Sequence, residues 1–472
     1  MNKHTVLNIA LASGLLLLVM QAPAVETAHV AASDRTTLGL TLYNQNLGLV
    51  RDSRALPQLN PGEQIILEDV SHQLQPESLR IANAGQVYEQ NLNTNLLNQN
   101  SLLQHYIGKE LQLARLNPAT GHEEVSQVTL LSFEGNRALI KQGNRFETIP
   151  LNQEQWRFIY PSLPEQLLTK PSLSFRSAGT KKAQTAEISY LTGGLNWNMD
   201  YLLTLNAAGT AVNIDGMATL QNNTGVDFPA AQISLLAGTV NQPDNAQYKR
   251  QGLEAMRTLS VAADTEIAPE TLQDFHLYTL PRSVDLLNGQ LKQVSLVTAS
   301  NVPVERSYQY QFLVYPTLER NQHRVKPDLG LRFKNDKKSH LGFPLPSGNL
   351  RTFSPDSNGQ LQFIGGGNIN HTGEDETVEL MLGKAFDVSI LRRQTQFSKT
   401  FNGFQVEQEL RISNTRSTPA KLELTANFPL SWEMQRSSMP YEKVQGGSAR
   451  WIIDVPAKGD AVLNFSVQME KR

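Results

Sequence analysis

Hydrophobic side chains alternate with polar or small ones along much of this chain, and this period of two constrains its fold more than any other feature. Residues 38–42 (LGLTL) show it near the start, and residues 378–382 (VELML) show it near the end. Successive side chains of a β-strand point to opposite faces, so each such stretch predicts a strand with one buried face. Long helical periodicity is nearly absent. The sequence therefore predicts a mainly β protein built from serial antiparallel β-domains.

Turn residues between the alternating stretches predict hairpins. Residues 44–46 (NQN) and 83–85 (NAG) each separate two strand-like segments near the start. Asn288-Gly289 is the strongest hairpin signal, because a type I′ turn needs a positive φ at both central positions. Residues 356–359 (DSNG) form a similar turn between two strand-like segments, 350–353 and 361–364.

The strand-like segments group into four folded regions, and the length of the chain suits about three domains of ordinary size. We expect a small antiparallel domain at 35–95 and a first immunoglobulin-like sandwich at 170–300. A second sandwich is expected at 301–472. Short strands with tight turns at 104–152 predict a small curled barrel of the SH3 or OB type. Residues 241–270 lack strand character, which predicts a mobile insertion with a short helix.

One local pattern occurs twice. Residues 219–224 (TLQNNT) lead through Pro229-Ala230 into an alternating stretch, and residues 410–415 (LRISNT) lead through Pro419-Ala420 into another. Proline is tolerated at the first residue of a strand. The repetition indicates two related immunoglobulin-like units, and a chance similarity of two hairpins is the alternative.

Residues 1–24 have the three parts of a cleavable signal peptide. Lys3 makes the first part positive, residues 6–20 are largely apolar, and Ala22-Pro23-Ala24 offers small residues for cleavage after Ala24. An uncleaved anchor is the alternative, but the apolar run is shorter than a spanning helix requires. We therefore expect a periplasmic or secreted protein without a transmembrane span in the mature chain.

Composition excludes several chemistries. The chain has no cysteine, which excludes disulfides, thiol nucleophiles, iron–sulfur clusters and a lipid-modified N-terminal cysteine. Its net charge is −2, and it has no basic stripe that could neutralise phosphates, so nucleic acid is not an expected partner.

No catalytic motif stands out. The eight histidines beyond residue 24 have no zinc-binding spacing, and no G-x-S-x-G element is present, so neither a cofactor nor a metal is expected. Residues 365–367 (GGG) lack the Lys-Ser/Thr of a phosphate loop and predict a flexible turn. Residues 374–376 (EDE) are the densest acidic cluster. They could serve glycoside hydrolysis, which needs two carboxylates that face each other across a cleft, but a solvated loop after Gly373 is the favoured explanation.

The residues weakly favoured for binding are Trp197, Asp200 and Tyr201. They follow Gly193-Gly194 and could form an aromatic platform for a sugar or a peptide. The alternative is that Trp197 anchors the core beside a turn that glycine permits.

Several longer stretches resemble an uncharacterised family of exported bacterial proteins, the domain of unknown function numbered 4139. They are YLTGGLNWNMDY (190–201), LYTLPR (277–282), LPSG (345–348), GKAFDV (383–388) and the opening LYNQNLGLVR (42–51). Some members have a mucoidy-inhibitor-A-like name and a coiled coil where this chain has its predicted barrel. The resemblance implies export and a β fold, and it carries no activity or catalytic residues.

The first functional hypothesis is an exported, non-enzymatic β-domain protein of the bacterial envelope that binds or scaffolds a protein or a surface polysaccharide. Exposed sheet edges would allow binding by β-augmentation. The alternative is a carbohydrate-active hydrolase whose carboxylates converge from separate strands. A purely structural spacer is a third possibility. Two carboxylates in an aromatic-lined cleft would favour the hydrolase, and an open edge strand or apolar patch would favour binding.

Overall fold

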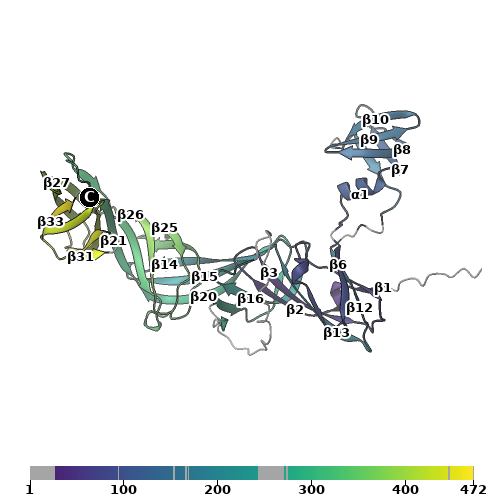
Figure 1. The fold of residues 1–472 in the computed structure, drawn as a ribbon, viewed down its shortest axis with the longest axis horizontal. Coiled ribbons are helices and arrows are strands. Elements are labelled where there is room, and N and C mark those ends of the chain that lie inside the picture. Colours follow the sequence, from purple (N-terminus) through teal and green to yellow (C-terminus); the bar gives the residue numbers. More distant parts are fainter. Residues whose placement is uncertain are drawn as a thin grey trace, which may run out of the picture. The chain divides into compact units, whose positions relative to one another are not determined.

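A computed structural model shows the fold, which is mainly β-strand, as the alternation predicts (Figure 1). It describes residues 27–93, 95–151, 155–164, 167, 170–242, 270–272, 275–444 and 447–470. The predicted signal peptide and nearly all of the predicted insertion at 241–270 lie outside the described residues.

The chain divides into two compact units. Unit 1 comprises residues 1–36, 53–70 and 81–187, and unit 2 comprises residues 37–52, 71–80 and 188–472. Some strands contain residues of both units: β2 (Arg35–Leu42), β3 (Gly48–Leu56), β5 (Arg80–Ala82) and β13 (Gln184–Thr192).

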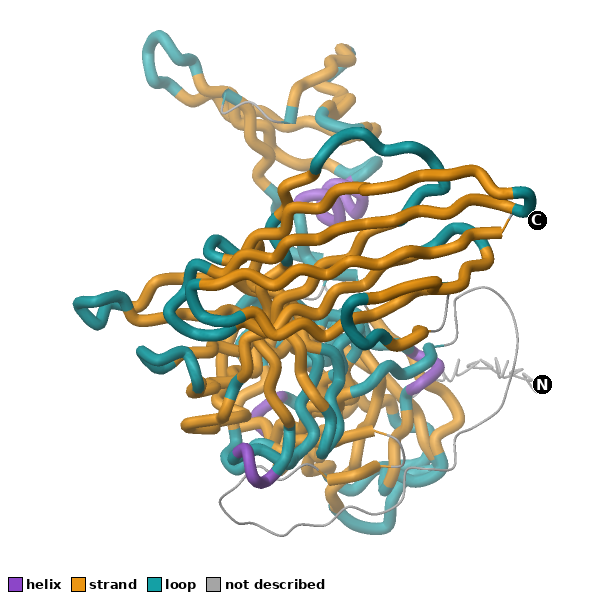
Figure 2. The backbone as a smooth tube through the Cα atoms, turned by 90° about the vertical axis from the view of Figure 1, so that its left-hand side faces the viewer, coloured by secondary structure: helices purple, strands orange, loops and turns teal. Residues whose placement is uncertain are grey.

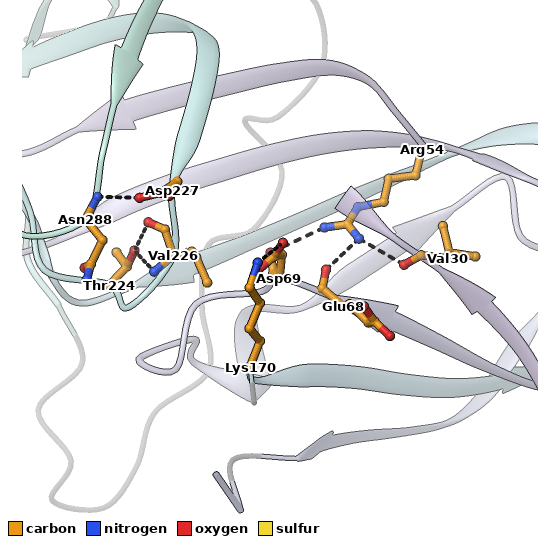
Figure 3. Close-up of polar contacts among 9 residues, drawn as sticks. All are labelled: Val30, Arg54, Glu68, Asp69, Lys170, Thr224, Val226, Asp227 and Asn288. Atoms are coloured by element: carbon orange, nitrogen blue, oxygen red, sulfur yellow. Dashed lines mark hydrogen bonds and ion pairs between the residues drawn. The ribbon is translucent and has the colours of Figure 1, made fainter. Parts of the chain in front are cut away.

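Unit 1 contains a four-stranded sheet in the order β1-β4-β12-β6. Its elements are β1 (Thr27–Val30), η1 (Ala32–Asp34), β4 (Gln64–Glu68), β6 (Val87–Asn93) and β12 (Ser172–Ser177). β1 runs parallel to β4, and the other neighbours are antiparallel. The buried guanidinium of Arg54 donates to the carbonyl oxygens of Val30 and Glu68, at 3.3 and 2.6 Å, and so joins the ends of these two strands (Figure 3).

Unit 1 also contains a small module, here defined as residues 98–151 and 155–160. Its elements are α1 (Gln99–Tyr106), β7 (Glu110–Leu116), β8 (Glu123–Glu134), β9 (Arg137–Gln142), β10 (Arg145–Pro150) and β11 (Trp156–Ile159). The strands form one sheet in the order β10-β9-β8-β7-β11, with a core of its own beneath α1.

The short strands predicted within 104–152 are confirmed as β7–β10, whereas α1 and β11 were not predicted. The prediction that these strands close into a barrel was wrong, because the terminal strands β10 and β11 are not paired with each other. The sequence explains part of this: Pro150 at the end of β10 has no N–H to donate across the opening. None of the sheets in the described part of the chain closes into a barrel.

Unit 2 contains a five-stranded sheet in the order β20-β15-β14-β24-β25. A second group of strands pairs with β16 and belongs to another sheet. These elements are η2 (Pro76–Ser78), β14 (Leu195–Leu205), β15 (Ala211–Asn222), β16 (Phe228–Ala237), β17 (Glu270–Leu272), β18 (Phe275–Thr279), β19 (Val284–Leu286), β20 (Leu291–Pro303), β24 (Gly348–Pro355) and β25 (Leu361–Ile369). β16 runs parallel to β2 and antiparallel to β18 and β19.

The rest of unit 2 is a sandwich of two sheets, in the orders β26-β23-β21-β29-β32-β31 and β22-β27-β28-β33-β30 (Figure 2). Its elements are β21 (Glu305–Leu313), β22 (His323–Val325), β23 (Asp328–Lys334), η3 (Lys337–Ser339), β26 (Thr377–Lys384), β27 (Val388–Thr400), β28 (Gly403–Asn414), β29 (Ala420–Asn427), β30 (Ser431–Ser437), β31 (Glu442–Val444), β32 (Ser448–Val455) and β33 (Gly459–Glu470). Both sheets contribute to one core, in which Leu424 and Trp451 face Leu410 and Phe465.

Two of the predicted domain boundaries are not supported by the strand pairing. Residues 35–95 do not form a separate domain, because β2 pairs with β16 and β6 pairs with β12. Residues 301–472 are likewise not one sandwich, because β24 pairs with β14 in the preceding sheet. Pairings between distant segments decide both cases, and local sequence does not show them.

Two predicted hairpins were also wrong. The turn at Asn83–Gly85 leads from β5 into β6, but β6 pairs with β12. The turn at Asn288-Gly289 is present, yet it joins β19, which pairs with β16, to β20, which pairs with β15. Asp227, directly before β16, accepts a hydrogen bond from the Asn288 backbone N–H at 2.8 Å, which holds this turn against the loop between β15 and β16 (Figure 3). The predicted hairpin between β24 and β25 is confirmed.

The repeated pattern corresponds to two matching strand corners. Asn222 ends β15 and Asn414 ends β28, and both side chains are buried. Each amide nitrogen donates to the carbonyl four residues on, and each amide oxygen accepts from the backbone N–H two residues on. The following strands also correspond, since β16 runs parallel to β2 and β29 runs parallel to β21. The sequence repeat therefore reflects a repeated supersecondary structure.

Candidate functional site

The predicted binding residues divide between the core and the surface. Trp197 and Tyr201 are 0 % and 1 % exposed, and they donate to the backbone oxygens of Leu236 and Pro346 at 3.2 and 2.7 Å. Burial raises the pKa of Tyr201 well above its usual value. These two rings present no face to a ligand, so the interpretation of Trp197 as a core anchor fits the structure.

Asp200 points to the other face of β14, as the alternation requires. Its carboxylate accepts from Thr219 at 2.9 Å and from Asn349 and Arg351 at 3.3 Å each. This is a closed polar network that spans β15, β14 and β24. Its members satisfy one another, so the three predicted residues do not form one site.

Ser347 and His371 form the arrangement closest to a nucleophile and a base. The hydroxyl of Ser347 lies 3.2 Å from Nε2 of His371, and the backbone N–H of Ser347 donates to Nδ1 at 3.2 Å. Because Nδ1 accepts a hydrogen bond, the neutral ring carries its proton on Nε2 and donates it to the hydroxyl. A general base for Ser347 would need a bare Nε2. The pair therefore positions the loop before β24 rather than activating Ser347.

The acidic cluster is a turn at the surface. Asp375 has a φ of +67°, Glu376 accepts from the backbone N–H of Gly373 at 2.8 Å, and Glu374 lies 3.6 Å from Lys337. The solvated-loop interpretation accounts for all three carboxylates. Residues 365–367, predicted as a flexible turn, instead lie in strand β25, where glycine permits close approach of a neighbouring backbone.

An apolar cavity lies in the small module. It has a volume of about 370 Å³ and lies between α1, the end of β10 and the edge strand β11. Its walls are mainly apolar and aromatic: Leu102, Leu113, Ile149, Pro150, Leu151, Trp156, Phe158 and Tyr160, with Asn98, Gln99 and Arg157 as the polar members. Such an apolar cavity with few polar groups is typical of a ligand site.

Strand β11 adds unpaired backbone groups to this cavity. Leu116 N–H donates to Gln155 oxygen at 2.9 Å, in the register that pairs Arg157 with Ala114. Hydrogen-bonded and non-bonded pairs alternate along an antiparallel ladder, so Trp156 and Phe158 direct their N–H and C=O groups away from β7. No described strand pairs with that side of β11. The cavity is therefore bordered by an open strand edge.

Charged residues near β11 are already paired. Arg157 makes a bidentate contact with Glu123, at 2.8 and 2.7 Å, and this contact lowers the pKa of that carboxyl. The guanidinium of Arg115 lies 4.1 Å from the centre of the Trp156 ring and 3.2 Å from Glu147. The cavity is thus close to neutral, which suits an apolar ligand segment.

A second cavity in the module is polar. Glu124 and Glu147 line it together with Arg115 and Arg145, and no aromatic ring is among its lining residues. The cavity with the aromatic walls has no carboxylate among its lining residues. Neither of these two cavities combines the carboxylate pair and the aromatic wall that the hydrolase hypothesis requires.

Comparison with known families gives a clear assignment for most of unit 2. The sequence profile of one family, described as Domain of unknown function (DUF4139), matches residues 186–471. The chain belongs to this family. A search of curated proteins found no match. The match begins within β13 and ends after β33, so the small module lies outside the DUF4139 region.

Two further observations concern membranes and metals. Among the described residues, no helix has the length and apolar character needed to cross a bilayer. Within that same part of the chain, no three histidine or acidic side chains gather in a way that could hold a metal ion.

Sequence reasoning missed the module cavity, although one signal was present. Residues 156–160 (WRFIY) carry an aromatic ring at every second position. That spacing puts Trp156, Phe158 and Tyr160 on one face of a strand. The stretch is short and follows the predicted barrel, so it could be recognised as a strand but not as the border of a cavity.

Proposed function

We propose that this DUF4139 protein is an exported, non-enzymatic binding protein of the bacterial envelope. Its small module captures an extended segment of a partner protein. One observation carries the proposal: the open edge of β11 runs beside an apolar cavity with aromatic walls. Backbone groups of Trp156 and Phe158 offer hydrogen bonds to an added strand, and the cavity offers space for its side chains.

The geometry favours β11 over β10 as the receiving edge. Leu151 N–H donates to Asn136 oxygen at 2.8 Å, in register with the β9–β10 ladder, so Phe146 and Pro150 face the free side of β10. Proline has no N–H, and proline on an edge strand opposes further pairing. Neither Trp156 nor Phe158 blocks β11 in this way. An added strand would therefore pair with β11 and extend the sheet toward β10.

Random peptides displayed on phage, selected against the immobilised mature protein, test the proposal. We expect selected peptides to carry apolar or aromatic residues at every second position, because alternate side chains of an added strand point into the cavity. Phe158→Pro removes one N–H from the open edge without removing a bond to β7, and it should abolish binding of these peptides.

Phe146→Pro is the matched control, because it removes an outward N–H from β10 in the same module, at a side chain that is 65 % exposed. This variant should bind like the unaltered protein. Circular dichroism of both variants checks that the sheets remain folded. The proposal fails if Phe158→Pro binds the selected peptides unchanged, if no peptide is selected, or if the pure protein cleaves envelope polysaccharide.

A further inference from the structure

The outer half of strand β25 carries an unusual concentration of exposed apolar surface. Leu361, Phe363 and Ile364 are 53 %, 61 % and 38 % exposed, and β25 contains no charged residue from Leu361 to Ile369. β25 is also the last strand of its sheet. Natural edge strands usually carry charges or prolines that prevent further pairing. This one carries neither.

The backbone groups that face outward can be assigned from the turn. Asp356 N–H donates to Gln360 oxygen at 2.8 Å, in the register that pairs Pro355 with Leu361. Gln360 and Gln362 therefore bond to β24, whereas Leu361 and Phe363 direct their N–H and C=O groups away from it. No described strand pairs with these outward groups.

The other half of β25 begins beside a neighbouring strand. A Cβ atom on Gly365 would lie only 2.5 Å from the backbone oxygen of Leu382 in β26, so β26 lies against the strand there. The register shifts between Thr352 and Phe353, opposite Ile364, and such a bulge bends the strand. The free edge is therefore limited to residues 360–364, on the part of the hairpin beyond the bulge.

This free edge is complementary to itself. If two copies meet antiparallel about an axis at Gln362, Leu361 of each copy exchanges N–H···O=C bonds with Phe363 of the other, giving about four hydrogen bonds. Leu361 and Phe363 share one face, so the same pairing also places each leucine beside the other copy's phenylalanine. Phe353 extends this face, with its ring centre 5.7 Å from that of Phe363.

The carboxylate of Asp356, next to this edge, already has hydrogen-bond partners. Oδ1 of Asp356 accepts from the backbone N–H groups of Asn358 and Gln360, and its Oδ2 accepts from the Gln362 amide at 3.1 Å. These bonds lower the pKa of Asp356, so its carboxylate is held within its own turn. Asp356 therefore does not present an unpaired charge to an identical strand.

We propose that this protein forms a reversible homodimer through the free edge of β25, with the two-fold axis at Gln362. A five-residue edge buries less surface than a standard stable interface, so the dimer is weak and depends on concentration. The inference is independent of peptide binding by the small module, because none of its residues belongs to that module.

Sedimentation velocity of the mature protein over a concentration series tests the dimer. We expect the mass to rise toward that of a dimer with concentration. Phe363→Lys places a charge on the edge and should weaken association by about tenfold or more, as like charges would then lie close together. Phe401→Lys is the matched control, since Phe401 is 103 % exposed on the β27–β28 turn, and it should associate normally.

A cross-linking measurement keeps the test valid if Phe363→Lys misfolds. The chain has no cysteine, so Gln362→Cys introduces a single thiol, and the two copies place it directly opposite itself. The Cα separation of such a non-bonded pair, about 4.5 Å, falls within the range for a disulfide. Gln362→Cys should form a covalent dimer on mild oxidation, and Asn358→Cys at the turn should not. A mass that stays monomeric at all concentrations, with no disulfide dimer of Gln362→Cys, overturns the proposal, as does equal dissociation by Phe401→Lys.

Discussion

At each of the two matching strand corners, a buried asparagine amide supplies bonds that the turning backbone cannot supply itself. The amide nitrogen of Asn222 donates to the oxygens of Val226 and Leu286, at 2.9 Å each, and its amide oxygen accepts from Thr224. The side chain thus holds together the end of β15, the loop before β16 and the end of β19. An aspartate at this position could not donate to the two carbonyls.

Replacing Asn222 with alanine is expected to destabilise unit 2. The variant removes a donor from the Leu286 oxygen and from the Val226 oxygen, which keeps only the Thr224 hydroxyl at 3.3 Å. A buried polar group left without a partner costs about 1–3 kcal/mol. Asn223→Ala is the control, because the neighbouring side chain is exposed. Denaturant unfolding followed by intrinsic fluorescence measures both variants. Equal midpoints for Asn222→Ala and Asn223→Ala would show that the amide bonds contribute nothing net.

The environment of His371 predicts that the stability of the fold depends on pH. Partial burial, and then the nearby His276, lower the pKa of His371 below its usual value of 6.5. The folded state therefore favours the neutral ring, which accepts a hydrogen bond from Ser347 N–H. This contribution is complete above pH 6.5, the unfolded value, and is lost as the pH falls toward the lower folded pKa.

The measurement compares the unfolding midpoints of the unaltered protein and of His371→Gln above and below pH 6.5. The unaltered protein should lose more stability on acidification than the variant, since glutamine does not titrate. His122→Gln, in an exposed turn of the small module, serves as control and should behave like the unaltered protein. An identical loss in all three proteins would contradict the prediction.

At the scale of single elements, β25 shows how glycine permits a neighbouring strand to approach closely. Gly365 has a φ of +149°, and a Cβ atom there would lie 2.5 Å from Leu382 oxygen, whereas a Cβ atom on Gly367 meets its nearest neighbour only at 3.9 Å. Gly365→Ala should therefore cost about 1–3 kcal/mol through backbone strain, and the contact with β26 adds to this. Gly367→Ala should be nearly neutral. Thermal unfolding of the two variants measures the difference, and similar melting temperatures would refute the argument.

The sequence predicted individual strands better than the partners of those strands. Local turn chemistry is sufficient for the β24–β25 hairpin, because its strands pair directly across the turn. The same chemistry is present at Asn288-Gly289, but the flanking strands enter different sheets. Which sheet a strand joins depends on burial against segments far away in the chain, and a single sequence does not contain that information locally.

The candidate site was missed for the same reason. Helix α1 has only eight residues, too few for a clear helical period, and its start depends on an Asn98 cap that accepts from Ser101 N–H. The cavity itself requires α1, β10 and β11 to lie side by side. Trp197 and Tyr201 are aromatic and near glycines, a pattern that fits a binding platform as well as a core position, and their burial places both in the core.

At the scale of the whole molecule, the family region and the proposed binding region are different parts of the chain. The DUF4139 match covers residues 186–471, whereas the cavity lies within residues 98–160. Loss of the module should therefore remove peptide binding while the fold of unit 2 remains. The β25 edge lies within the family region, so dimerisation and peptide binding should fail independently when either is mutated.

Export is the last prediction and the one on which the envelope role depends. Expressed in a Gram-negative bacterium, the protein should be released by osmotic shock. Its intact mass should equal that of a chain whose first residue is Val25. Signal peptidase requires small residues before the cut, so Ala24→Leu should leave the precursor at the membrane. Because the chain has no cysteine, a host that lacks periplasmic thiol oxidation should yield the same amount of folded protein. Full-length protein in the cytoplasm would remove the basis for an envelope partner, while the open edge of β11 would still predict peptide binding in another compartment.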